Sequence, residues 1–156
     1  MAVEIPTLWP VNDIKVDVLT PLAILRVQAN ELSKITQGIL KAEVLTTQGD
    51  EVTTHVLDII APSLNSRHRV LGVTHSNEMV YPVIVDAEIF QQMKATLGLM
   101  NPWGHEDEAS SQQEFVNIVR KVLVSGPVLA ALQSFIARSN EQTSDNSAEG
   151  NEKTPS

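Results

Sequence analysis

Residues 39–85 read ILKAEVLTTQGDEVTTHVLDIIAPSLNSRHRVLGVTHSNEMVYPVIV, and this stretch decides the fold. Alternating apolar and polar residues, many of them β-branched, predict strands rather than helices. Turn-forming residues interrupt the pattern at Gln48-Gly49, at 62–66 and at 76–78. The strands that we expect between these turns are 39–47, 50–61, 69–75 and 79–85.

The three turns also predict a register, in which Val44 lies opposite Thr53, His55 opposite Val73, and Val73 opposite Tyr81. Side chains on one face of a sheet recur at every second residue, so the register assigns each residue to a face. One face collects apolar residues and is the expected core layer: Leu40, Ala42, Val44, Leu57, Ile59, Leu71, Val73, Tyr81, Val83 and Val85.

The second face is mixed rather than polar. It is expected to carry Lys41, Glu43, Leu45, Val52, Thr54, Val56, Asp58, His68, Val70, Thr74, Val80 and Ile84. Apolar residues such as Val56, Val70 and Ile84 need cover, which C-terminal helices or a second chain could supply. We therefore expect these three residues in an interface. Pro82 cannot donate a ladder hydrogen bond, which predicts that the fourth strand is an edge or contains a bulge.

A helix is expected before the sheet. Thr20 suits the N-cap and Pro21 the first helical position, and Gly38 follows as a stop signal. An apolar stripe at helical spacing runs from Leu22 to Ile35. The segment PLAILRVQANELSKIT at 21–36 resembles one in small uncharacterised bacterial proteins, and that resemblance implies no activity, ligand or site.

Two or three helices are expected after the sheet. Asp86 is placed to cap the first, Ser111 and Glu114 have capping-box spacing, and Pro127 opens the last helix. Residues 139–156 are acidic and almost free of apolar side chains, which predicts a disordered tail. The sequence thus predicts a single α+β domain at 1–138, an antiparallel meander of four to five strands with one helix before it. Residues 1–18 form an extended arm, in which 14–18 could add an edge strand.

Composition excludes several classes of protein. The 156 residues include no cysteine, and of the formal net charge of −8 the tail contributes −3, which leaves −5 for the body. An acidic body disfavours nucleic acid as a partner, because phosphate binding needs clustered Lys and Arg. No apolar run is long enough for a membrane span, and no secretory signal pattern is present. We expect a cytoplasmic bacterial protein without a cofactor.

Candidate site residues are few. His55 and His75 are expected as diagonal neighbours on one face, near Arg69 at the rim of the sheet. They lack the spacing of a metal motif, so no metal site is expected. Trp103, in an Asn-Pro-Trp-Gly context, is a candidate interface residue, although packing onto its own domain is the ordinary alternative.

Two functions remain after the common catalytic and nucleotide-binding motifs are found to be missing from the sequence. The first is a non-catalytic protein-interaction module, acting as a homo-oligomer or as an accessory or adaptor of a larger protein. The alternative is a small enzyme or ligand-binding domain with a site at the sheet rim near His55, His75 and Arg69. We expect the first, with a protein partner or self-association and with neither nucleic acid nor membrane as a partner.

Overall fold

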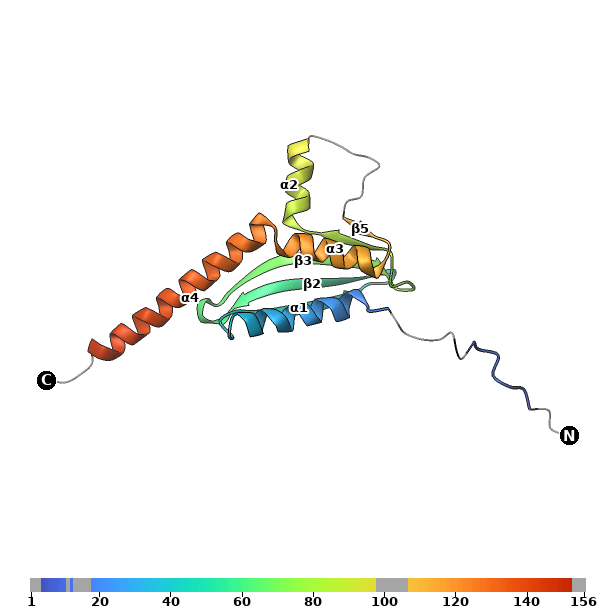
Figure 1. Cartoon of the computed structure of the whole chain (residues 1–156), viewed down its shortest axis with the longest axis horizontal. Coiled ribbons are helices and arrows are strands. Elements are labelled where there is room, and N and C mark those ends of the chain that lie inside the picture. The colour runs from blue at the N-terminus through green and yellow to red at the C-terminus, as the bar shows by residue number, and fades with distance from the viewer. Residues whose placement is uncertain (1–3, 11, 13–17, 98–106, 153–156) are drawn as a thin grey trace.

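The computed structural model describes residues 4–10, 12, 18–97 and 107–152. The predicted α+β class is confirmed: one helix precedes an antiparallel sheet of five strands in the order β1-β2-β3-β4-β5, and helices follow (Figure 1). The elements in chain order are α1 (Pro21–Ile35), β1 (Lys41–Gln48), β2 (Val52–Ala61), the 3-10 turn η1 (Pro62–Leu64), β3 (Ser66–Ser76), β4 (Val83–Asp86), α2 (Glu88–Leu97), β5 (Glu108–Ala109), α3 (Gln112–Leu123) and α4 (Gly126–Glu152).

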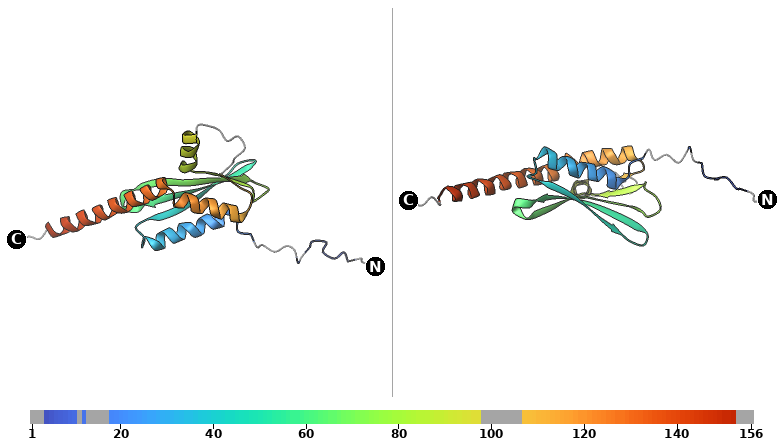
Figure 2. Two further views of the ribbon diagram at one scale, coloured as in Figure 1. Left: turned by 45° about the horizontal axis from the view of Figure 1, so that its top comes forward. Right: turned by 90° about the horizontal axis from the view of Figure 1, so that it is seen from below.

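The sheet is covered on one side. Helices α1 and α3 lie across the same face, with the first part of α4 beside them, as the view from below shows (Figure 2). The core forms between these helices and the sheet, and its largest fully buried side chains include Phe115, Leu25 and Leu71. Within the described part of the chain, no helix lies across the opposite face of the sheet, although α2 borders that face beside β4.

Helix α1 begins as the sequence predicts. The Thr20 hydroxyl oxygen accepts a hydrogen bond from the Ala23 backbone N–H at 3.1 Å, and Pro21 is the first helical residue. Gly38, at a φ of +81°, closes the helix by donating its N–H to the Ser33 carbonyl at 2.9 Å. The predicted stripe stops short, because Ile35 is 74% exposed.

The predicted register is correct for the central hairpin and shifted for its neighbours. His55 pairs with Val73, but Val44 pairs with Leu57 rather than Thr53, and Val73 with Val85 rather than Tyr81. Both shifts are of four residues, so every side chain involved keeps its predicted face. The side chain of Asn77 explains one difference: its amide donates to the Gly49 carbonyl at 2.9 Å instead of closing a tight turn.

A bulge in β3 makes the predicted face of His68 wrong. The β2–β3 register changes at Leu57/Asp58, which leaves Val70 as the extra residue of β3. His68 consequently lies opposite Ile59 on the covered face, not on the mixed face.

The prediction that the fourth strand lies at an edge of the sheet is wrong. Strand β4 pairs on both sides, Pro82 precedes it, and the outer strand on that side of the sheet is β5. Of the predicted edge strand 14–18, residues 14–17 lie outside the described residues and Val18 is not in a strand.

Helix α3 begins with the predicted capping box. The Ser111 hydroxyl accepts from the Glu114 N–H at 3.2 Å, and the Glu114 carboxylate accepts from the Ser110 N–H at 2.6 Å. Helix α4 is continuous through Glu152, so it includes most of the segment 139–156, for which disorder remains a prediction. Among the residues searched, no single helix meets the length and composition of a membrane span; α3 and the first part of α4 meet them only as a pair bent by 52°.

Candidate functional site

The uncovered face of the sheet, which we call the open face, is the main candidate. Its members alternate with the core residues along each strand and lie opposite one another in the register. They are Lys41, Glu43, Leu45, Thr47, Val52, Thr54, Val56, Asp58, Ile60, Arg67, Arg69, Gly72, Thr74, Ile84 and Asp86. Charged residues gather toward η1, and threonine and apolar residues toward the β1–β2 turn.

Four residues of the charged half form a neutral cluster, beside which Lys41 also lies. The Asp58 carboxylate, with a side chain 3% exposed, lies 3.4 Å from the Arg67 Nε and 3.5 Å from the Arg69 Nε. Arg67 also pairs with the carboxylate of Glu43. These two carboxylates and two guanidinium groups cancel in charge. Both arginines are about half exposed or more, so their pairs with Asp58 orient the side chains without creating an isolated charge.

The other half exposes apolar side chains. Leu45 is 39% exposed, Val52 46% and Ile84 56%. Between them the hydroxyls of Thr54 and Thr74 share one hydrogen bond of 3.1 Å. A solvated antiparallel sheet face normally alternates to polar residues. This half therefore has the composition of a surface that is covered by another molecule.

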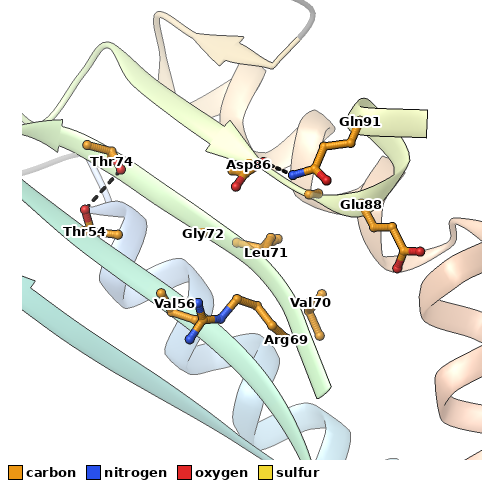
Figure 3. A pocket seen from close by; sticks show the side chains of 11 residues that line it. Thr54, Val56, Arg69, Val70, Leu71, Gly72, Thr74, Asp86, Glu88 and Gln91 are labelled. Atoms are coloured by element: carbon orange, nitrogen blue, oxygen red, sulfur yellow. Dashed lines mark hydrogen bonds between the residues drawn. The ribbon is translucent and has the colours of Figure 1, made fainter. Parts of the chain in front are cut away.

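A hollow of about 280 Å³ opens on this face between β3, β4 and α2 (Figure 3). Its lining residues are Thr54, Val56, Arg69, Val70, Leu71, Gly72, Thr74, Asp86, Ala87, Glu88 and Gln91. Gly72 lies in the centre of the face, paired with Val56 on one side and Asp86 on the other. A Cβ at Gly72 would approach no other part of the chain closer than the His55 carbonyl oxygen, at 4.0 Å. The missing side chain thus contributes to the hollow.

One wall of the hollow is anionic. Asp86 ends β4, and because α2 begins at Glu88, the N-cap position is held by Ala87 rather than by the predicted Asp86. The Asp86 carboxylate accepts a hydrogen bond from the Gln91 side-chain amide at 3.1 Å. Glu88, in the first turn of α2, accepts from the Gln92 amide at 3.2 Å. Where side chains are described, neither carboxylate forms an ion pair. Among the described side chains, the wall therefore carries two carboxylates that have no cationic partner.

The predicted histidine pair forms on the covered face. The Nε2 atoms of His55 and His75 are 3.0 Å apart. His75 Nδ1 lies 2.7 Å from the Ser76 carbonyl oxygen, which can only accept, so Nδ1 carries the proton and Nε2 of a neutral His75 is an acceptor. His55 must then donate from Nε2, and its Nδ1 accepts from the Thr46 hydroxyl at 2.8 Å. The contacts assign both tautomers by elimination.

Burial lowers the pKa of His55 below its usual value, and the positive charges of His75 and Arg26 lower it further. The 5% exposure of this side chain makes a charged form costly to solvate. At neutral pH His55 is therefore uncharged and hydrogen-bonded on the covered face of the sheet. Burial likewise raises the pKa of Tyr81, whose hydroxyl donates to the Leu19 carbonyl at 3.0 Å.

The structure separates the residues of the predicted ligand site. His55 and His75 meet on the covered face, whereas Arg69, 67% exposed, extends over the open face beside Val56 (Figure 3). The three do not form one site, because the sheet itself lies between them. Within the described residues there is also no group of three or more His, Cys, Asp or Glu side chains placed to hold a metal ion.

The predicted interface residues divide in a similar way. Val56 and Ile84 lie on the open face as expected, with Ile84 exposed and Val56 half-buried. Val70 is only 3% exposed, because the bulge turns it into the protein, so it offers little surface to a partner. Trp103 lies outside the described residues.

Sequence reasoning missed the hollow, although a signal was present. Gly72 interrupts the predicted strand 69–75, and a glycine inside a strand often marks a close approach of another molecule or a bulge. The carboxylates of Asp86 and Glu88 gave no such signal, since their position depends on where α2 leaves the sheet.

Comparisons of the chain with protein-family models, with curated proteins and with solved structures gave no match. What the protein does is therefore inferred from its own residues.

Proposed function

We propose that this chain is a non-catalytic protein-interaction module that binds a protein partner, or a second copy of itself, through the open face. One observation carries the proposal: helices cover one side of the sheet, while Leu45, Val52 and Ile84 on the other side remain exposed. Exposed apolar groups gain about 25 cal/mol for each Å² removed from water, so a partner that covers them gains affinity.

The face also has the layout of a specific interface. Protein–protein contacts typically combine apolar surface with polar groups at the margin that fix the orientation of the partner. Here the neutral cluster of Glu43, Asp58, Arg67 and Arg69 is that margin. A typical stable interface buries about 800 Å² on each partner.

The charge of the chain narrows the class of partner. With a formal net charge of −8, it is poorly suited to a phosphate backbone. The absence of cysteine supports a cytoplasmic location, because it leaves no disulfide that would need an oxidising compartment. The proposal therefore includes neither nucleic acid nor membrane as a partner.

The proposal is tested by placing a charge on each side of the molecule. Ile84→Arg alters the open face, and Val27→Arg is a matched control on α1, because these side chains are 56% and 52% exposed. We expect Ile84→Arg to abolish self-association, measured as mass by light scattering, and Val27→Arg to leave it unchanged. Circular dichroism checks that both variants are folded.

If the purified chain is a monomer, the same variants are compared as tagged baits. A partner retained by the unaltered chain and by Val27→Arg, but lost from Ile84→Arg, then supports the proposal. A monomer that retains no protein, or a partner that both variants retain equally, contradicts it.

A further inference from the structure

We infer that the hollow beside Gly72 is a socket for an arginine or lysine side chain of the protein partner. This inference rests on the proposed function, since the socket lies within the open face and becomes part of the interface. It adds the chemistry of one contact: a cationic head group held by Asp86 and Glu88, with its aliphatic stem on the floor of the hollow.

The charges of the lining select a cation. Arg69 is the positive group of the hollow, but its charge is balanced within the cluster that contains Asp58, Arg67 and Glu43. The two carboxylates of the opposite wall have no such balance among the described side chains. An anionic ligand would meet two like charges, whereas a guanidinium or ammonium group would meet two opposite charges.

The shape of the hollow suits a long side chain rather than a compact ion. The floor of the hollow is apolar: Val56 is half-buried, and the buried residues Val70, Leu71 and Ala87 lie beneath the carboxylates. Arginine and lysine combine an aliphatic stem with a charged end, and they gain from burying the stem while the head stays near solvent. A hollow of about 280 Å³ is large enough for one such side chain and too small for a compact folded element.

Gly72 provides the means to close the socket without disturbing the sheet. A Cβ there would be in ordinary van der Waals range of the His55 carbonyl at 4.0 Å, and valine is a favourable residue inside a strand. Gly72→Val should thus fold normally while its two methyl groups fill the floor. Thr47→Val is the matched control, because it places the same side chain elsewhere on the open face.

The experiment measures binding of two small probes to the full-length chain by amide NMR shifts. Nα-acetyl-arginine amide supplies the proposed head and stem, and Nα-acetyl-citrulline amide is nearly isosteric but neutral. We expect the arginine probe to shift Gly72, Thr74 and Glu88 with a dissociation constant on the order of millimolar, as suits so few atoms. The citrulline probe should bind about tenfold more weakly or worse, because it lacks the charge.

Gly72→Val should remove the arginine shifts and Thr47→Val should keep them. Equal binding of both probes, an absence of shifts with the arginine probe, or unchanged binding to Gly72→Val each overturns the socket. These outcomes are distinct from failure of the proposed function: if Ile84→Arg disrupts association but Gly72→Val does not, the open face is an interface and the socket is not part of it.

Discussion

The two faces of this one sheet differ in how fully their side chains are held. On the covered face Leu57, Leu71 and Val73 are at most 3% exposed, and the polar pair His55 and His75 has a partner at each ring nitrogen. On the open face, Ile84 is 56% exposed. The comparison shows that the hydrophobic core is built on one side of the sheet, while apolar side chains on the other side remain exposed.

The largest effect is expected from truncation on the covered face. Leu71→Ala should lower the free energy of unfolding by about 2–5 kcal/mol, because Leu71 is 1% exposed and its truncation leaves a cavity in the core. Ile84→Ala should change it by about 0.5 kcal/mol or less. Urea denaturation of both variants measures the contrast, and similar losses at the two positions would show that the open face is part of the folding core.

A smaller effect is expected from the charged half of the open face. Asp58→Ala should destabilise the protein by about 1–3 kcal/mol, because it removes a buried acceptor from two guanidinium groups. Glu43→Ala, which removes an exposed carboxylate from Arg67, should cost less than about 1 kcal/mol. Chemical denaturation again gives the comparison; if Glu43→Ala costs as much as Asp58→Ala, burial is not what makes Asp58 important.

The histidine pair predicts a pH dependence confined to the covered face. Because the pKa of His55 is lower in the folded state, the unfolded chain binds more protons as the pH falls below about 6.5. The contribution of uncharged His55 to the free energy of unfolding is therefore complete above that pH. Below it, the free energy of unfolding declines by at most about 1.4 kcal/mol per pH unit.

This decline is measured as the pH dependence of urea denaturation between pH 7 and 5. His55→Phe should show a shallower decline than the unaltered chain. His68→Asn is the control, since within the described residues no hydrogen bond joins His68 to the pair. Identical slopes in the unaltered chain and in His55→Phe would exclude a role for the pair.

A small effect on stability is also expected at Gly72. Gly72→Val should alter the free energy of unfolding by about 1 kcal/mol or less, with an increase favoured, because glycine inside a strand is itself destabilising. Thermal unfolding followed by circular dichroism measures this change. A loss of several kcal/mol would mean that the space above Gly72 is needed by the fold, and would remove the basis for treating it as a binding feature.

Particular residues show how far the sequence predicts this molecule. The faces of Val44, Leu57 and Val85 are correct because strand periodicity depends only on whether a residue is odd or even, and both register shifts were even. His68 was assigned to the wrong face because a single bulged residue, Val70, reverses that alternation. The residues around Val70 give no sequence signal for a bulge.

The candidate site was predicted less well than the fold. The meeting of His55 and His75 follows from the central register, which depends on one short connection and was correct. The separation of Arg69 from them and the position of Glu88 beside Gly72 arise from the bulge and from the direction of α2. Both are tertiary features, which local patterns do not encode.

Asn77 has a consequence for how a partner would be met. Its carbonyl oxygen accepts from the Thr53 hydroxyl at 2.6 Å, its amide donates to Gly49, and its backbone N–H donates to Glu51 at 3.0 Å. These three hydrogen bonds connect the segment between β3 and β4 to the β1–β2 hairpin and thereby restrain the two segments relative to each other. A binding molecule would then encounter a surface already set in shape, and little ordering entropy would be lost on docking at that end.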